Sequence, residues 1–115
     1  MAENAADDFA GRNADFSSDI SFILWDLVQN QYINESSYLA EVTQKAMSDR
    51  LRIRDRGVKQ ANFTVLQGAR MPAMLIETAF LSNPQEEELL VDAAFQEKVA
   101  MGLVEAVRKF RARYE

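Results

Sequence analysis

The feature that most constrains this chain is an apolar run over residues 73–78 that contains a single carboxylate. The run is nearly all apolar, as expected for a strand that is covered on both faces of a sheet. Pro72 comes directly before it, at the first strand position, where proline is tolerated. Glu77 lies near the end of the run, and a lone carboxylate there is costly unless it has a partner or a function. The sequence therefore predicts a buried strand that presents Glu77 near its C-terminal end.

A helix-start signal follows this strand within a few residues. Asn83 and Pro84 are typical of the N-cap and first positions of a helix, and Glu86 at the third position completes a capping-box pattern. This helix is predicted to be short and to end near Val91. Asp92 is then predicted to be the N-cap of the last helix. The buried stripe of that last helix is predicted to be Phe95, Val99, Leu103, Val107, Phe110 and Tyr114.

The N-terminal half of the chain predicts further helices. A short helical piece is expected over residues 3–9. Asp19 is predicted to cap a helix that runs to about Gln31, because apolar residues then recur at helical spacing. Asn34 is predicted to cap a separate helix. The inner face of that second helix is expected to hold Leu39, Val42, Ala46 and Met47.

Between these helices and the apolar run, the sequence predicts a loop and a second strand. Residues 50–62 have no apolar period and contain Gly57, which indicates a loop. Residues 63–66 are aromatic and β-branched, which is typical of a strand. The chain thus predicts an α/β fold with about two strands and four to five helices. Because two strands alone rarely form a stable sheet, we expect more sheet N-terminal to Met1.

Composition excludes several classes of function. At 115 residues the chain is one domain or part of one, and its net charge of −5 disfavours nucleic acid as a partner. It has no histidine and no cysteine, so neither imidazole nor thiolate can bind a metal, and histidine-based acid–base catalysis is excluded within it. No apolar run approaches the roughly 18 residues that a membrane helix needs. The first residues are acidic and small, so no signal peptide is expected.

Six short blocks occur in the same order as in a known enzyme family. These blocks are residues 3–5, 23–27, 36–40, 54–61, 63–66 and 71–88. In this order they resemble the C-terminal half of the catalytic domain of the zinc-dependent N-acetylmuramoyl-L-alanine amidases, bacterial cell-wall hydrolases that include autolysins. The last block carries the most specific part of the resemblance. It implies that residues 1–115 are the C-terminal portion of such a domain, whose fold is a mixed six-stranded sheet flanked by helices.

The resemblance also implies a reaction and a role for Glu77. Members of the family hydrolyse the amide between the lactyl group of N-acetylmuramic acid and L-alanine. Their zinc ligands, two histidines and a glutamate, lie in the N-terminal half of the domain, and none of those positions exists in this chain. Glu77 matches the family's catalytic glutamate, the general base for zinc-bound water. Without the resemblance, Glu77 is better interpreted as a structural carboxylate, paired with Arg70 or accepting helix N–H groups near Asn83.

Two residues of the predicted loop are candidates for binding substrate. Arg56 and Gln60 both lie in the 54–61 block. An Arg guanidinium fits carboxylates, and the stem peptide of peptidoglycan carries carboxylates. The alternative is a solvated loop whose cations pair with the chain's own acids.

These observations lead to two hypotheses of different classes. The first is a peptidoglycan hydrolase of the cell envelope, periplasmic or extracellular, with zinc as the cofactor of the full domain; the chain alone is expected to be inactive because it lacks the ligands. The second is a non-catalytic relic of the amidase fold that binds peptidoglycan or a partner protein. An unrelated helical interaction protein is disfavoured by the apolar strand around Glu77. In either case an exposed sheet edge is expected to favour self-association.

Overall fold

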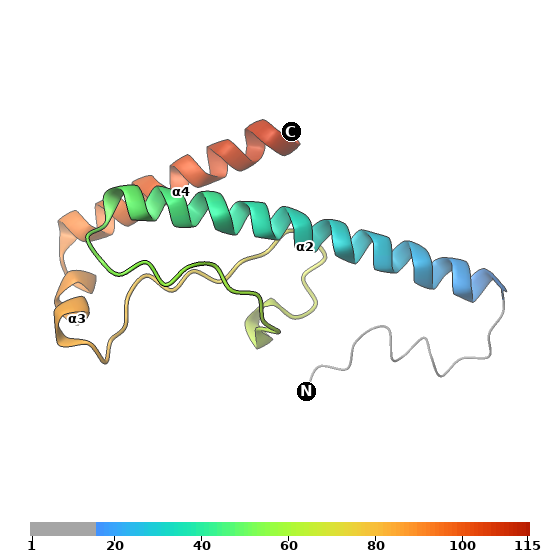
Figure 1. Cartoon of the computed structure of the whole chain (residues 1–115), viewed down its shortest axis with the longest axis horizontal. Coiled ribbons are helices and arrows are strands. Elements are labelled where there is room, and N and C mark those ends of the chain that lie inside the picture. The colour runs from blue at the N-terminus through green and yellow to red at the C-terminus, as the bar shows by residue number, and fades with distance from the viewer. Residues whose placement is uncertain (1–15) are drawn as a thin grey trace.

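The computed structural model describes residues 16–115, and this part of the chain is helical. Its elements are α2 (Phe16–Arg50), the 3-10 helix η1 (Thr64–Leu66), α3 (Pro84–Leu90) and α4 (Ala93–Tyr114). Figure 1 shows α2 as a long rod, with α4 beside its C-terminal half and α3 at the same end. No strand occurs over residues 16–115, so the predicted α/β fold with a mixed sheet is wrong for them. The helix predicted at residues 3–9 lies outside the described residues.

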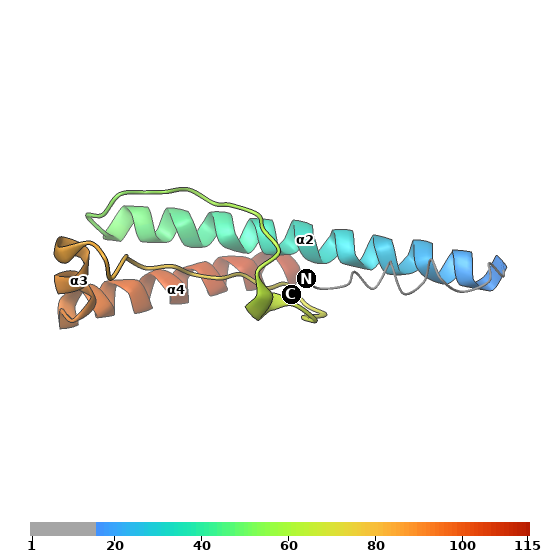
Figure 2. The same cartoon turned by 90° about the horizontal axis from the view of Figure 1, so that it is seen from below.

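The two predicted strands fail because neither has a partner. The first is instead the 3-10 turn η1, in which Leu66 N donates to Phe63 O at 3.0 Å. Residues 72–80 do run extended, but a strand needs a neighbour about 4.8 Å away with which to share backbone bonds. The other extended stretch, residues 52–62, overlaps them in Figure 1, yet Figure 2 shows the two on opposite flanks of α2. Self-association stays a prediction, but residues 16–115 contain no sheet edge of the kind that was expected to mediate it.

Helix α2 is continuous where the sequence predicts two helices. Asn34 lies in its interior rather than at an N-cap, and Asp19 lies in its first turn. The chain has neither glycine nor proline between Phe16 and Arg50, and an interior asparagine lowers helix propensity only modestly. The hydrogen bond from Gln31 Nε2 to Glu35 Oε1, 2.9 Å long, spans the predicted break. At 35 residues the helix is about 52 Å long.

The caps predicted for the last two helices are confirmed. The Asn83 side chain accepts from Gln85 N at 3.0 Å and from Glu86 N at 3.2 Å, and the Asp92 side chain accepts from Phe95 N at 3.3 Å. The reciprocal half of the predicted capping box is absent from this helix end. Asn83 N donates to Phe80 O instead, and the Glu86 carboxylate bonds to Arg56.

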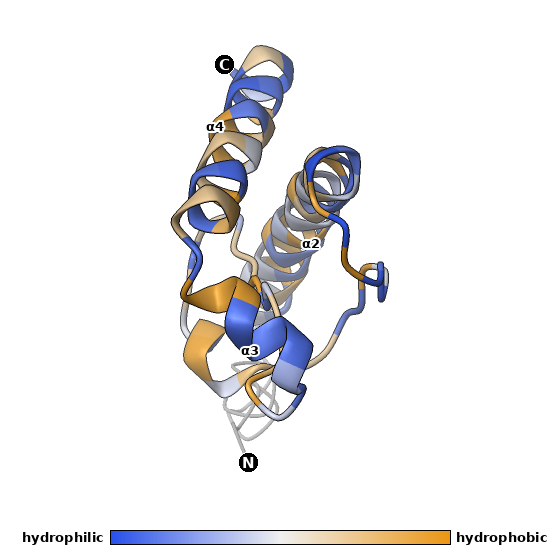
Figure 3. Cartoon of the chain, turned by 90° about the vertical axis from the view of Figure 1, so that its left-hand side faces the viewer, coloured by the Kyte–Doolittle hydropathy of each residue, from blue (hydrophilic) through white to orange (hydrophobic). Residues whose placement is uncertain are grey.

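The core lies between α4 and the C-terminal half of α2. Met47, Leu51 and Phe95 are buried, and five half-buried residues pack against them. Those five are Ile53, Leu89, Leu90, Val99 and Leu103. Gly102 allows the two helices to approach closely, since a Cβ added there would lie 3.0 Å from Met47 Sδ. Figure 3 looks along this pair of helices and shows α3 in front, below their near ends. In the predicted buried stripe of α4, Phe95 is buried and Val99, Leu103 and Phe110 are half-buried. The prediction is wrong for Val107 and Tyr114, which are 48% and 39% exposed.

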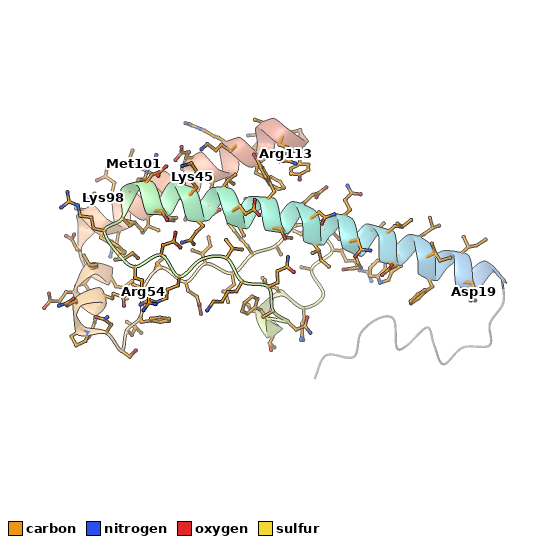
Figure 4. All side chains as sticks on the ribbon, in the orientation of Figure 1. Asp19, Lys45, Arg54, Lys98, Met101 and Arg113 are labelled. Atoms are coloured by element: carbon orange, nitrogen blue, oxygen red, sulfur yellow. The ribbon has the colours of Figure 1, made fainter. Side chains whose placement is uncertain are left out.

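Polar and aromatic contacts complete the α2–α4 interface. Arg50 at the end of α2 pairs with Glu105 of α4, and this hydrogen bond is the main reason that the pKa of Glu105 is lowered. At the other end, Tyr38 lies 6.4 Å from Phe110 between ring centroids. Arg113 stacks over the Tyr38 ring at 4.2 Å, and Figure 4 shows its side chain between the two helices.

The N-terminal half of α2 extends past the end of α4 (Figure 1). Its apolar residues are exposed, with Ile23 at 57%, Leu24 at 58% and Leu27 at 60%. The stripe that predicts a helix here is therefore present, but none of the described residues covers it. In the described part of the chain no helix is long and apolar enough to cross a membrane.

Candidate functional site

One groove of about 830 Å³ collects the residues that the sequence singles out. Its walls come from three segments: the middle of α2, the loop over residues 52–62, and the extended residues 72–80. Glu77, Arg56 and Gln60 all line it, although they come from two separate segments. The fold thus brings the predicted catalytic residue and both predicted substrate-binding residues to the same concave surface.

Glu77 is exposed in this groove and has no hydrogen-bond or ion-pair partner among residues 16–115. The two structural partners considered from sequence are engaged elsewhere. The guanidinium of Arg70 stacks over the Trp25 ring at 5.2 Å, and Asn83 caps α3. The carboxylate is therefore unpaired within residues 16–115, and its role as general base stays a prediction.

Arg56, by contrast, is paired with an acid of the chain itself. Its Nη1 and Nη2 donate to Glu86 Oε1 and Oε2 at 3.0 and 3.2 Å, and its guanidinium carbon lies 4.2 Å from the Phe80 ring centroid. The hydrogen bonds to Glu86 raise the pKa of Arg56 above its ordinary value, so the guanidinium stays protonated. The loop cation thus pairs with an acid of this chain, as the alternative interpretation predicts. The predicted contact of Arg56 with substrate stays a prediction.

Two adjacent serines of α2 hold the two walls of the groove. Gln60 Nε2 donates to Ser37 Oγ at 2.8 Å, which ties the loop to the helix. Ala73 N donates to Ser36 Oγ at 2.9 Å, which fixes the start of residues 72–80, the Glu77 segment. Sequence reasoning missed both roles. The signal available in the sequence was a pair of adjacent serines within a helical stretch. Serine at such a position is most often solvent-exposed, so the pair by itself does not predict an anchoring role.

Asp55 is a second loop anchor that sequence reasoning missed. Its carboxylate accepts from Gly57 N at 2.7 Å and from Ser48 Oγ at 2.9 Å, and Gln44 Nε2 also donates to it. These bonds lower the pKa of Asp55, the Gly57 amide having the largest effect. Gly57 has a φ of 77°, a left-handed conformation that favours glycine. The Asp-x-Gly spacing, which is typical of a turn, was the available signal.

The described residues do not form a zinc site. Residues 16–115 contain no group of three or more His, Cys, Asp or Glu side chains that could hold a metal ion. The whole sequence has no histidine and no cysteine. The donors that catalytic zinc sites use are imidazole, thiolate and carboxylate. Of these the chain offers only carboxylates, and those of residues 16–115 form no such group.

Comparison with known proteins places the chain in a family. Residues 6–109 match the family model of N-acetylmuramoyl-L-alanine amidase. The chain is 39% identical over 106 residues to "N-acetylmuramoyl-L-alanine amidase AmiA" of Escherichia coli strain K12, a match that covers 91% of the chain and 37% of AmiA. It is 31% identical over 110 residues to "N-acetylmuramoyl-L-alanine amidase AmiC" of Neisseria meningitidis serogroup B, covering 96% of the chain and 26% of that protein.

A third relative matches a shorter stretch. "N-acetylmuramoyl-L-alanine amidase LytC" of Bacillus subtilis strain 168 is 40% identical over 68 residues, which is 59% of the chain and 14% of LytC. No solved structure matches the chain. The chain spans little more than a third of the length of AmiA, at 37%. Within that span, it belongs to the N-acetylmuramoyl-L-alanine amidase family.

Proposed function

We propose that this chain is the C-terminal part of a peptidoglycan amidase domain and that Glu77 is its general base. The bond cleaved is the amide between N-acetylmuramic acid and L-alanine, in the cell envelope. The observation that carries the proposal is the state of Glu77: an exposed carboxylate, lining a groove, with no partner among the described residues. Membership of the amidase family supports the choice of reaction.

The chemistry required of Glu77 is proton transfer in two steps. Its carboxylate accepts a proton from the water whose oxygen attacks the amide carbon. When the C–N bond breaks, the same proton passes to the departing amine of L-alanine, and Glu77 returns to its ionised form. General-base catalysis of this kind contributes about 10²- to 10⁴-fold to a rate.

We further propose that the chain alone is inactive. The resemblance implies a zinc ion that polarises the amide and activates the water, held by two histidines and a glutamate outside this chain. Residues 16–115 contain no group of three such side chains that could hold the ion. In the chain alone, Glu77 could therefore accept a proton, but no zinc-activated water would be present to donate one.

The test is a chimera in which this chain replaces the segment of AmiA that it matches. We expect the chimera to release stem peptide from purified sacculi, and the isolated chain to release none. Glu77→Gln in the chimera should lower the rate by about 10²-fold or more, because the amide cannot accept the proton. Glu88→Gln is the matched control, since Glu88 is exposed and lies in α3.

Either of two results would contradict the proposal. One is a Glu77→Gln chimera as active as its parent, and the other is hydrolysis by the isolated chain. A folded chimera without activity, combined with co-sedimentation of the isolated chain with sacculi, would instead favour the non-catalytic binding module.

A further inference from the structure

Arg56 joins three parts of the chain around the end of the Glu77 segment. It leaves the loop over residues 52–62, its guanidinium lies 4.2 Å from the Phe80 ring centroid, and its two terminal nitrogens bond to Glu86 in the first turn of α3. We call Arg56, Phe80 and Glu86 the Arg56 clamp. Phe80 follows Glu77 by only three residues.

The clamp depends on the shape of the guanidinium. Glu86 is buried, with 6% of its surface exposed, and an ionised carboxylate there is costly without a partner. The planar guanidinium offers two parallel N–H donors to that carboxylate while its face covers the phenyl ring. A lysine ammonium would keep the charge but could not supply the paired donors or the flat face.

The extended backbone around Glu77 has little else to hold it. Over residues 72–80 it lacks strand partners, and its backbone is bonded only near its ends: Ala73 N donates to Ser36 Oγ, and Phe80 O accepts from Asn83 N. One side chain adds a weak contact, from Thr43 Oγ1 to Met74 Sδ at 3.5 Å. Phe80 lies only three residues after Glu77, so holding Phe80 in place limits how far the backbone at Glu77 can move.

We infer that Arg56 is a positioning residue for Glu77, acting through Phe80 and Glu86 rather than by contact with substrate. The inference rests on the proposed function of Glu77 as general base. It differs from the substrate contact that the sequence predicts for Arg56. A base displaced by about 1 Å can lose about 10²-fold in rate, so loss of the clamp should lower kcat while leaving KM nearly unchanged.

The first experiment uses the full chain alone and needs no activity. Hydrogen exchange is measured at the amides of Asn83, Gln85 and Glu86, which are bonded at the junction between the Glu77 segment and α3. We expect Arg56→Lys and Glu86→Gln to speed this exchange about tenfold, the scale of one lost charge-assisted bond. Arg52→Lys and Glu88→Gln are the matched controls, because both residues are exposed and have no partner among residues 16–115.

The second experiment measures kcat and KM in the AmiA chimera. Arg56→Lys should lower kcat about 10²-fold with KM within about twofold of the parent. Arg56→Ala should regain activity when guanidinium chloride is added at millimolar concentration, because the free cation can occupy the space between Phe80 and Glu86. The same salt should not restore Glu86→Gln, whose carboxylate is gone.

The outcomes separate this inference from the proposed function. If Glu77→Gln abolishes activity while Arg56→Lys matches Arg52→Lys in kcat and in exchange, the clamp is overturned and Glu77 keeps its role. A rise in KM with unchanged kcat in Arg56→Lys also overturns it, in favour of a substrate contact. If Glu77→Gln is fully active, the proposed function fails, whereas faster exchange in Arg56→Lys would still show that the clamp fixes this segment.

Discussion

The two halves of helix α2 have different surroundings although one continuous element contains both. In the C-terminal half, Ala46 and Met47 are buried against α4. In the N-terminal half, Ile23 and Leu24 are more than half exposed, at 57% and 58%, despite being as apolar as core residues. The difference teaches that forming a helix in this chain needs only local signals, whereas burying its apolar face needs a second element. Residues 16–115 supply that element to one half alone.

The largest expected contrast between the halves comes from deleting a phenyl ring in each. Phe95→Ala removes a ring that is 6% exposed in the α2–α4 core and should lower the free energy of unfolding by about 3–5 kcal/mol. Phe22→Ala removes one that is 38% exposed and should change it by less than about 0.5 kcal/mol. Urea denaturation followed by circular dichroism measures both. Equal losses for the two variants would mean that the halves of α2 are covered alike.

The closeness of α2 and α4 gives the second contrast. Gly102→Val places a branched side chain where even a Cβ lies 3.0 Å from Met47 Sδ, and should destabilise the chain by about 1–3 kcal/mol. Ala100→Val, on the exposed side of α4, adds similar bulk without that contact and serves as the control. A Gly102→Val variant as stable as Ala100→Val in urea would show that the helices can separate at no cost.

A smaller effect is expected at the start of α3. Asn83→Ala removes the side chain that accepts from Gln85 N and Glu86 N, and should cost about 1 kcal/mol of stability. Ser82→Ala, one residue earlier and exposed, should cost much less. The measurement is the thermal unfolding midpoint of each variant. If both midpoints equal that of the parent, the Arg56 clamp rather than the cap holds this helix end.

The smallest effect concerns the loop and pH. Hydrogen bonds lower the folded-state pKa of Asp55 below its ordinary value of 3.8, so its contribution to stability is present above that value. That contribution is lost as the pH falls through the lowered folded pKa. We expect the NMR signal of the Gly57 amide, which donates to Asp55, to change only below pH 3.8. In Asp55→Asn the same signal should be independent of pH; a titration there would assign the change to another group.

Sequence predicts this fold best where a signal is local. The caps at Asn83 and Asp92 and the loop after Arg50 are confirmed because a few neighbouring residues decide each of them. The strands at residues 63–66 and 73–78 fail because a strand exists only with a partner, and propensity says nothing of the partner's location.

The candidate site shows the same division between features with a local signal and features that depend on distant residues. Glu77 is found from the sequence because a carboxylate in an apolar run is locally conspicuous. The pairing of Arg56 with Glu86 joins residues 30 positions apart, and the anchoring of Gln60 by Ser37 joins residues 23 apart. Contacts over such distances follow from how the loop folds back on α2, which no single-sequence pattern encodes.

The adjacent serines of α2 also limit how this groove can change in evolution. Neighbouring residues of an α-helix are offset by about 100° around its axis and about 1.5 Å along it. Ser36 and Ser37 fasten opposite walls, so this fixed offset sets the angle at which the groove opens. Substitutions can alter what lines the groove, but one residue inserted between the two serines would turn one wall by about 100° relative to the other. We therefore expect relatives that share this groove to tolerate variation in its lining and no length change at that point of the helix.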